Sequence, residues 1–399
     1  MLKWLVKKVL SRFKPPIVRL TRRLLEESGV EAQLQAIIRQ LYDIYDIKGH
    51  AQALEQQFKA LEQHLQWKDS VSIVLDVARQ VRKQSGHPLA RDLDMHYGHC
   101  ADLLMRHGKE LESANRLRFK EDDWSLDYVK SMGCYVPENE TESTIGAKES
   151  PLRGLLDNPD CGVFLVAGQS NAANHGDIPY RPKSEVYTLN FMNMRCYLAE
   201  DPLSGASGMG GSIWSRLGDQ LVEAGVYSKV LFVPLAFGGT FARDWIQGGS
   251  MVRRLDLCLS RLYKAVGGIV PLSAVFWQQG EAEANHTDMS SEAYVEHIQC
   301  LIASFRERFV VAPVFVATAT LCARDSPVFD NARQIRKGQH DLVMPELGIL
   351  AGPDLDQVGA GERYDGCHFS DVGLNHCAHL WLGVIRDARP VLLKPRFLV

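Results

Sequence analysis

The hydrophobic pattern of the chain changes twice along its length. From about residue 26 to residue 135, apolar residues recur every three or four positions, which is the spacing of one face of a helix. A polar, aperiodic stretch follows at 136–152, and beyond it short apolar runs alternate with helix-length stretches. The pattern predicts a helical domain over 26–135, a linker over 136–152 and an α/β domain over 153–399.

The helical domain shows several apolar stripes of helix length, joined by short turns. Three of them are Leu54, Phe58, Leu61 and Leu65; Val71, Val74, Val77, Ala78 and Val81; and Leu89, Leu93, Cys100, Leu103 and Leu104. This arrangement predicts antiparallel hairpins or a short solenoid, although no period repeats cleanly enough to specify a repeat class. The segment carries no catalytic constellation, so we expect it to bind a protein partner or to act as a spacer.

Four apolar runs predict the strands of the second domain. They lie at 162–167, 230–235, 274–277 and 314–317. A strand that is apolar throughout is buried on both faces, which favours a parallel sheet with helices on both sides. In such a sheet, functional residues collect in the loops that follow the carboxyl ends of the strands.

Charge is distributed unevenly along the chain. The formal net charge is −3, but residues 1–25 hold eight Lys and Arg and no acid, which leaves −11 on the rest. A body this acidic disfavours binding to nucleic acid, because phosphate contacts need a basic face.

The basic first 25 residues predict a short amphipathic helix. Its apolar stripe is followed by Pro15-Pro16, which ends the helix; the stripe residues are Leu2, Leu5, Val6, Val9, Leu10 and Phe13. A cationic amphipathic helix suits the surface of an anionic membrane, and the alternatives are a solvated tail or a helix docked on protein. The apolar runs here are too short for a secretory signal, and no run in the chain approaches the roughly 18 residues that span a bilayer.

The nine cysteines are odd in number, scattered and without paired short spacing. This usage predicts reduced thiols and no disulfide framework. We therefore expect a cytoplasmic protein, which the basic first 25 residues would hold at the inner face of the membrane if they bind lipid.

Unusual polar or glycine-rich segments follow the predicted strands. A serine on a tight turn after a buried strand is a candidate nucleophile, and glycines let backbone N–H groups approach a ligand. An Asp three residues before a His can orient one ring nitrogen and leave the other to face a serine. Singly, each segment is also consistent with an ordinary polar turn. The four segments are Gly168-Gln169-Ser170-Asn171, Phe237-Gly238-Gly239-Thr240, Gln278-Gln279-Gly280-Glu281 and Asp365-Gly366-Cys367-His368.

In this order, the four segments resemble the SGNH hydrolases, and within them the sialate O-acetylesterase-like group, carbohydrate esterase family six. The resemblance covers about residues 160–390. It implies a three-layer α/β/α, flavodoxin-like parallel sheet, preceded here by the all-helical segment. It further implies Ser170 as nucleophile, His368 as general base and acid, and Asp365 as the residue that orients His368.

The same resemblance implies the oxyanion hole and the substrate contacts. The backbone N–H groups of Ser170 and Gly239 and the side chain of Gln279 would form the hole. Gln169, Asn171, Gly238 and Glu281 would contact substrate, and no cofactor or metal is implied. One departure from the family pattern is Glu283, which stands where an Asp is common, and this places the substrate contacts in question more than the triad.

Other functions account for the same residues less well. His376, Cys377 and His379 resemble a metal cluster but follow a helical spacing, and a glycosidase pair of Glu281 and Glu283 leaves the Ser, Asp and His unexplained. An α/β-hydrolase would take its acid and histidine from separate loops. The resemblance thus implies a serine esterase that removes O-acetyl or similar groups from an acylated carbohydrate. The alternatives are an O-acyltransferase that uses the same acyl-serine and a non-catalytic glycan-binding adaptor.

Overall fold

The computed structural model describes residues 87–118, 125–140, 149–150, 152–266, 268–322 and 331–392. The predicted amphipathic segment at 1–25 and the helical stripes before residue 87 lie outside these residues. The described part belongs to one compact unit that starts at Leu65.

An eight-stranded sheet forms the centre of this unit, in the order β1-β4-β3-β5-β2-β6-β7-β8. Six neighbouring strands, from β3 to β8, are parallel, and β4 and β1 extend the β3 edge in antiparallel fashion. The strands are β1 (Glu149–Ser150), β2 (Cys161–Gly168), β3 (Val186–Asn190), β4 (Arg195–Leu198), β5 (Lys229–Pro234), β6 (Ala274–Gln278), β7 (Val314–Thr318) and β8 (Ile349–Asp354).

The four predicted apolar runs became β2, β5, β6 and β7, and the prediction of a parallel sheet is confirmed. Without the β3–β4 hairpin and β1, the order β5-β2-β6-β7-β8 is the flavodoxin-like order 2-1-3-4-5. After β2, the chain adds β5 on one side of it and then places β6 and the later strands on the other side, so the order reverses between β2 and β6. This switch point is where such folds place their ligands.

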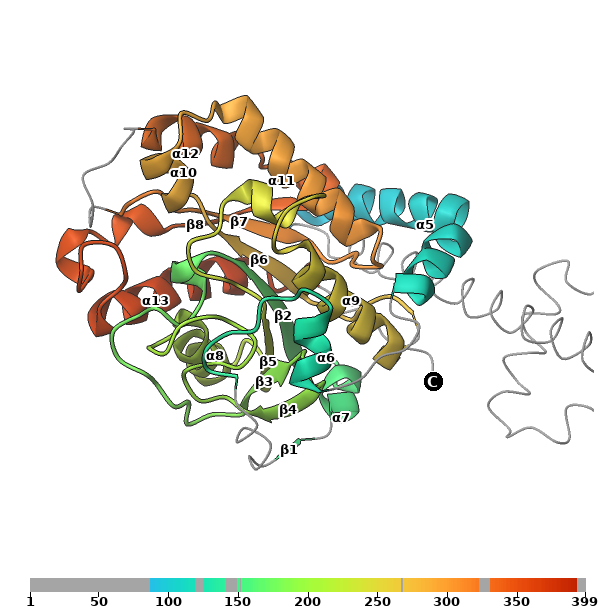
Figure 1. Cartoon of the computed structure of the whole chain (residues 1–399), viewed down its shortest axis with the longest axis horizontal. Helices are drawn as coiled ribbons and strands as arrows, with labels where there is room; N and C mark the ends of the chain where they lie inside the picture. The colour runs from blue at the N-terminus through green and yellow to red at the C-terminus, as the bar shows by residue number, and fades with distance from the viewer. Residues whose placement is uncertain are drawn as a thin grey trace, which may run out of the picture. The chain divides into compact units, whose positions relative to one another are not determined.

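Helices cover both faces of the sheet (Figure 1), and β6 shows why. Phe276 stacks on Trp214 of α8 and lies against Trp381 of α13. The next residue, Trp277, points the other way, packs on Trp245 and donates to Tyr294 of α11. Because neighbouring strand residues face opposite sides, this one strand needs an apolar layer on each side.

The helices of these two layers are α7 (Leu152–Asp157), α8 (Ile213–Glu223), α9 (Val252–Val266), α10 (Glu281–His286), α11 (Ser291–Arg306), α12 (Ala332–Asp341) and α13 (Asp371–Ala388). Short 3₁₀ turns link them: η2 (Ser170–Ala172), η3 (Ala242–Trp245), η4 (Pro345–Leu347), η5 (Leu355–Gln357) and η6 (Ala360–Glu362). Serines 212, 290 and 370 cap α8, α11 and α13 by accepting from backbone N–H groups of the first turn.

The described part of the predicted helical domain packs directly on the α/β unit. Helices α5 (Ala90–Arg118) and α6 (Leu126–Ser131) contribute residues such as Leu93 and Val129 to the same hydrophobic core as the sheet. His96 bonds to the carbonyl of Val311, just before β7, at 2.8 Å. These helices are therefore attached to the sheet and not held apart from it.

The first residues of the predicted linker are also docked on the α/β unit. Glu138 accepts from the N–H of Gly208 at 2.9 Å, and buried Glu140 accepts from Asn190 and from the N–H of Gly205. Residues 136–140 thus behave as a fixed connection, while the domain boundaries themselves stay a prediction.

Candidate active site

The sequence-predicted site residues meet at the carboxyl edge of the sheet. Ser170 follows β2, Gly239 follows β5, Gln279 follows β6, and Asp365 and His368 lie in the loop between β8 and α13. β2 and β6 are hydrogen-bonded neighbours whose last residues, Gly168 and Gln278, are in register. The parallel topology therefore gathers residues that are almost 200 positions apart in sequence.

Ser170 begins the 3₁₀ turn η2 at the end of the fully buried strand β2. The turn is tight because Gly168 has a φ of +136°, and a Cβ there would lie 2.0 Å from the carbonyl oxygen of Gln278. The Ser170 side chain is not engaged in any hydrogen bond within the described residues. The structure therefore presents it as a hydroxyl on a rigid strand-to-helix turn.

Asp365 and His368 form a hydrogen-bonded pair. The Nδ1 atom of His368 lies 2.9 Å from Oδ2 of Asp365, and Oδ1 accepts from the backbone N–H groups of Cys367 at 3.0 Å and His368 at 2.7 Å. Burial alone would raise the pKa of Asp365, but these bonds together hold it below the ordinary value. The aspartate stays ionised and fixes the ring so that its Nε2 atom is free to exchange a proton.

A buried arginine clamps the loop that carries this pair. Arg363 donates to the carbonyls of Val358, Cys367 and Leu355, at 3.1, 2.6 and 3.2 Å, and stacks on Phe369. The clamp holds the peptide immediately before His368.

Asn171 joins the serine turn to this loop. Its Nδ2 atom donates to the carbonyl of Cys367 at 3.3 Å and to Oε1 of Glu281 at 2.8 Å. Asn171 follows Ser170 and Cys367 precedes His368, so a single amide group spans the turn and the loop that carry the predicted nucleophile and base.

The backbone N–H groups of Ser170 and Gly239 are among those at the site that have no acceptor within the described residues. The N–H of Gly238, by contrast, donates to Oγ of Ser207 at 2.7 Å. Gly239 is exposed and has a φ of +72°, and open space surrounds the position of a Cβ. Of the two glycines in this turn, Gly239 and not Gly238 therefore has a backbone donor to offer.

Gln279 is fully buried and does not offer the open side-chain donor that the sequence predicts. Its Nε2 atom donates to Gln169 at 3.2 Å, to the carbonyl of Thr240 at 3.4 Å and to Glu283. Three acceptors already exceed the two amide hydrogens. In this arrangement the side chain of Gln279 therefore links the segments that follow β2 and β5. Glu283, the departure from the family pattern, accepts this bond and also accepts from the N–H of Ala242.

The predicted substrate contacts Gln169, Asn171 and Glu281 are buried, at 4%, 4% and 2% exposure. Gln169 accepts from the N–H groups of Gly280 and Ala282 as well as from Gln279. These three side chains bond within the protein, which makes them part of the scaffold under the site instead of a surface for substrate. Gly238 is half-buried, with its N–H engaged as described above.

Glu281 is the most unusual of these groups electrostatically. Burial raises its pKa to about 7, against the opposing effect of the hydrogen bond from Asn171. Its Oε2 atom is buried without a partner. The carboxyl therefore titrates near neutral pH although it lies beneath the site.

One disulfide at the site corrects the prediction that all cysteines are free thiols. Cys322, shortly after β7, bonds to Cys367, next to His368, and the other seven cysteines are free. The pair is 45 residues apart in sequence, and only the adjacency of the β7 and β8 strand ends brings it together. Spacing in the sequence cannot reveal such a pair, and the cysteine count no longer supports the predicted compartment.

Sequence reasoning also missed His175 and Tyr364, whose rings flank His368. The centroids of His175 and Tyr364 lie 5.5 and 6.2 Å from that of His368, with interplanar angles of 24° and 27°. No motif marks either residue, since their position follows from the path of the loops.

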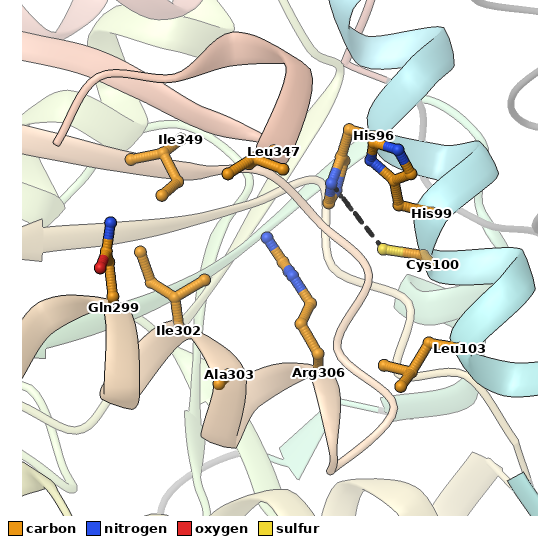
Figure 2. A pocket seen from close by; sticks show the side chains of 10 residues that line it. All are labelled: His96, His99, Cys100, Leu103, Gln299, Ile302, Ala303, Arg306, Leu347 and Ile349. Atoms are coloured by element: carbon orange, nitrogen blue, oxygen red, sulfur yellow. Dashed lines mark hydrogen bonds between the residues drawn. The ribbon is translucent and has the colours of Figure 1, made fainter. Parts of the chain in front are cut away.

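A cavity of about 440 Å³ lies away from these residues, between α5 and α11 and near the amino ends of β7 and β8 (Figure 2). Its walls include His96, Cys100, Ile302, Arg306 and Ile349. The predicted chemistry lies at the carboxyl ends of the strands, so this cavity is not the predicted site.

The described residues show neither a metal-binding cluster nor a membrane-spanning helix. Those residues contain no group of three or more His, Cys, Asp or Glu side chains that could hold a metal ion. His376, Cys377 and His379 lie along α13, as their helical spacing predicted, and His376 pairs with Glu362 at 3.0 Å. None of the described helices is both long and apolar enough to cross a membrane.

Comparison with known proteins gives one family match. The family described as "Carbohydrate esterase, sialic acid-specific acetylesterase" matches residues 160–379. A search of curated proteins found no significant match.

Solved structures with a similar fold include a protein from Arabidopsis thaliana, at 19% identity and a TM-score of 0.44, covering 57% of this chain and 98% of that one. A carbohydrate acetylesterase from Xanthomonas citri is 16% identical, with a TM-score of 0.38, and the match covers 58% of this chain and 56% of that one. A carbohydrate esterase family 3 protein from Talaromyces cellulolyticus is 11% identical, with a TM-score of 0.36 and coverage of 57% and 98%.

Proposed function

Because the chain belongs to the carbohydrate esterase family of sialic acid-specific acetylesterases, we propose that it is a serine esterase that removes O-acetyl or similar acyl groups from a carbohydrate. The observation that carries this proposal is the Asp365–His368 pair, on a loop that Asn171 ties to the turn of Ser170. This pair orients the His368 ring through Nδ1 and leaves Nε2 available, which is the arrangement that a general base requires.

The proposed reaction uses residues of this chain alone. The Oγ atom of Ser170 attacks the acyl carbonyl while Nε2 of His368 takes its proton, and Asp365 stabilises the imidazolium that forms. The N–H groups of Ser170 and Gly239 donate to the negatively charged oxygen of the tetrahedral intermediate.

The bond between the acyl carbon and the sugar oxygen then breaks; that oxygen takes the proton from His368 and leaves as a hydroxyl, and the acyl group remains on Ser170. Water, deprotonated by His368, attacks the acyl-serine, and the acid is released with the serine restored. If a sugar hydroxyl took the place of water in this second step, the same acyl-serine would give acyl transfer.

The test compares wild-type protein with Ser170→Ala on a chromogenic acetyl ester and on O-acetylated sialic acid. We expect the substitution to abolish hydrolysis and covalent labelling by a fluorophosphonate, with the fold intact. Ser260→Ala is a matched control, because Ser260 is a buried serine on α9 whose hydroxyl has no partner. Its activity should equal that of the wild type.

Two outcomes would count against the proposal. Residual hydrolysis in Ser170→Ala, with the probe on another residue, would place the nucleophile elsewhere. A wild-type protein that neither hydrolyses an acyl ester nor reacts with the probe would remove the enzymatic assignment altogether. A parallel reaction with a free sugar acceptor measures how much acyl group goes to sugar instead of water.

A further inference from the structure

His175 lies five residues after Ser170 and touches both parts of the proposed catalytic machinery. On one side its ring stacks on the ring of His368, at a centroid distance of 5.5 Å. Tyr364, whose ring also stacks on His368, donates from its hydroxyl to the backbone carbonyl of His175 at 3.2 Å. The backbone of His175 and the ring of His368 are thereby held in one cluster.

On its other side, His175 contacts the glycine turn after β5. Its Nε2 atom lies 3.1 Å from Oγ of Ser207, which also accepts from the N–H of Gly238 at 2.7 Å. A Cβ on Gly238 would lie 2.7 Å from the same Nε2 atom, so the ring lies directly against this backbone. The next residue, Gly239, carries the unengaged N–H group.

The segment that holds Ser207 is itself rigidly attached. The backbone N–H of Ser207 donates to the carbonyl of Ala236 at 3.2 Å, and its carbonyl accepts from the N–H of Asn174 at 2.8 Å. The side chain of Asn174 also donates to the carbonyls of Leu203 and Ala206. Ser207 is therefore a fixed point between His175 and the glycine turn.

His175 is uncharged in the range where an esterase of this kind works. Burial and, to a smaller extent, the neighbouring His368 lower its pKa to about 4, against the opposing effects of Glu138 and Asp365. A neutral ring stacks on His368 without adding a second positive charge when His368 accepts the serine proton.

We propose that His175 is a positioning residue of this esterase, which holds the His368 ring by stacking and the Gly238-Gly239 turn through Ser207. The proposal rests on the proposed esterase function and assigns no chemical step to His175. According to this proposal, the positions of the base His368 and of the oxyanion donor Gly239 both depend on the side chain of His175. Truncating that side chain should therefore lower kcat and leave KM nearly unchanged.

The test uses steady-state hydrolysis of 4-nitrophenyl acetate by the full-length protein. For His175→Ala we expect kcat to fall roughly 10- to 100-fold, since misplacing a catalytic group by about 1 Å costs on that order, with KM within about twofold of the wild type. Ser207→Ala should also lower kcat, because it removes the bridge to Gly238. The double variant should lose much less than the product of the two single losses, because both act partly through one contact.

Two substitutions separate the two contacts of His175. His175→Gln keeps a polar group near the position of Nε2, and His175→Phe keeps a ring to stack on His368. Each should recover part of the loss in kcat seen for His175→Ala, and adding Ser207→Ala should cancel the recovery in the Gln variant only. Ser260→Ala again serves as the control for loss of a buried serine hydroxyl.

Several results would overturn the proposal. A raised KM with unchanged kcat would make His175 a substrate contact, and wild-type kinetics in His175→Ala would make it dispensable. If the kcat losses of His175→Ala and Ser207→Ala multiply fully in the double variant, His175 does not act through Ser207. If the wild type neither hydrolyses the ester nor reacts with a fluorophosphonate, the proposed function fails and this proposal fails with it, an outcome distinct from an active wild type with an unaffected His175 variant.

Discussion

The buried carboxyl of Glu281 makes the stability of this protein depend on pH in a direction that can be calculated. Its pKa in the folded state is about 7, against an ordinary value of 4.5. Between these values the folded chain holds a proton that the unfolded chain has lost. The free energy of unfolding therefore falls as pH rises through this window, and the full penalty is present above pH 7.

The size of the effect follows from the same two values. Each pH unit between them is worth about 1.4 kcal/mol, so ionisation of Glu281 costs the fold roughly 3 kcal/mol, most of which develops between pH 5 and pH 8. Glu281→Gln removes this titration and keeps a side-chain oxygen that can accept from Asn171. The free energy of unfolding of the variant relative to wild type should therefore rise by roughly 2 to 3 kcal/mol from pH 5 to pH 8, because any effect of the amide that does not depend on pH cancels in this difference.

Urea unfolding followed by tryptophan fluorescence at several pH values measures this difference. Glu296→Gln, an exposed position on α11, is the matched control and should give a curve parallel to that of the wild type. Parallel curves for Glu281→Gln as well, within about 0.5 kcal/mol, would show that the carboxyl is solvated or paired in the native state and would refute the reasoning.

Three further predictions concern the acid, the disulfide and the amino terminus. Asp365→Asn should lower kcat by roughly 10⁴, the loss seen when the aspartate of a serine protease is changed in this way, and full activity would mean that His368 is structural. Cys322→Ser opens a loop of 45 residues, which should reduce the free energy of unfolding by about 4 kcal/mol in urea titrations, and an unchanged midpoint and slope would show that the thiols are not paired in solution. Deleting residues 1–25 should abolish co-sedimentation with anionic vesicles at low salt and leave turnover of a soluble ester unchanged, because the remaining body carries a net charge of −11; equal pelleting of both forms would exclude this segment as the membrane contact.

The sequence predicted the strands that are apolar along their whole length. β2 and β6 are buried at every position, and such runs are unambiguous. β8 was missed because Ile349–Asp354 contains Gly352 and Pro353 and has an exposed residue in its middle. The β3–β4 hairpin was missed because its second strand, Arg195–Leu198, is short and begins and ends with residues that are not buried.

At the site, motifs predicted which residues gather but not which way they face. Gln279 and Glu281 follow a buried strand just as Ser170 does, yet their side chains turn inward and bond to Gln169 and Asn171. Inward and outward residues have the same polarity in this part of the sequence, so composition cannot separate them. The role of His175 depends on Ser207, 32 residues further along the chain, and is set by tertiary contacts alone.

Ser170 stands at the end of the first long strand of the sheet, and His368 stands in the loop before α13, its last described helix. During translation, Ser170, the proposed nucleophile, therefore emerges from the ribosome well before His368, its proposed base. For the time needed to translate the nearly 200 residues between them, the emerging chain carries a serine without a partner. Under the proposed mechanism, a nascent chain or a fragment that ends before Asp365 contains the Gly238-Gly239 turn and is still inert. Esterase activity of this protein would therefore report only chains translated at least through His368.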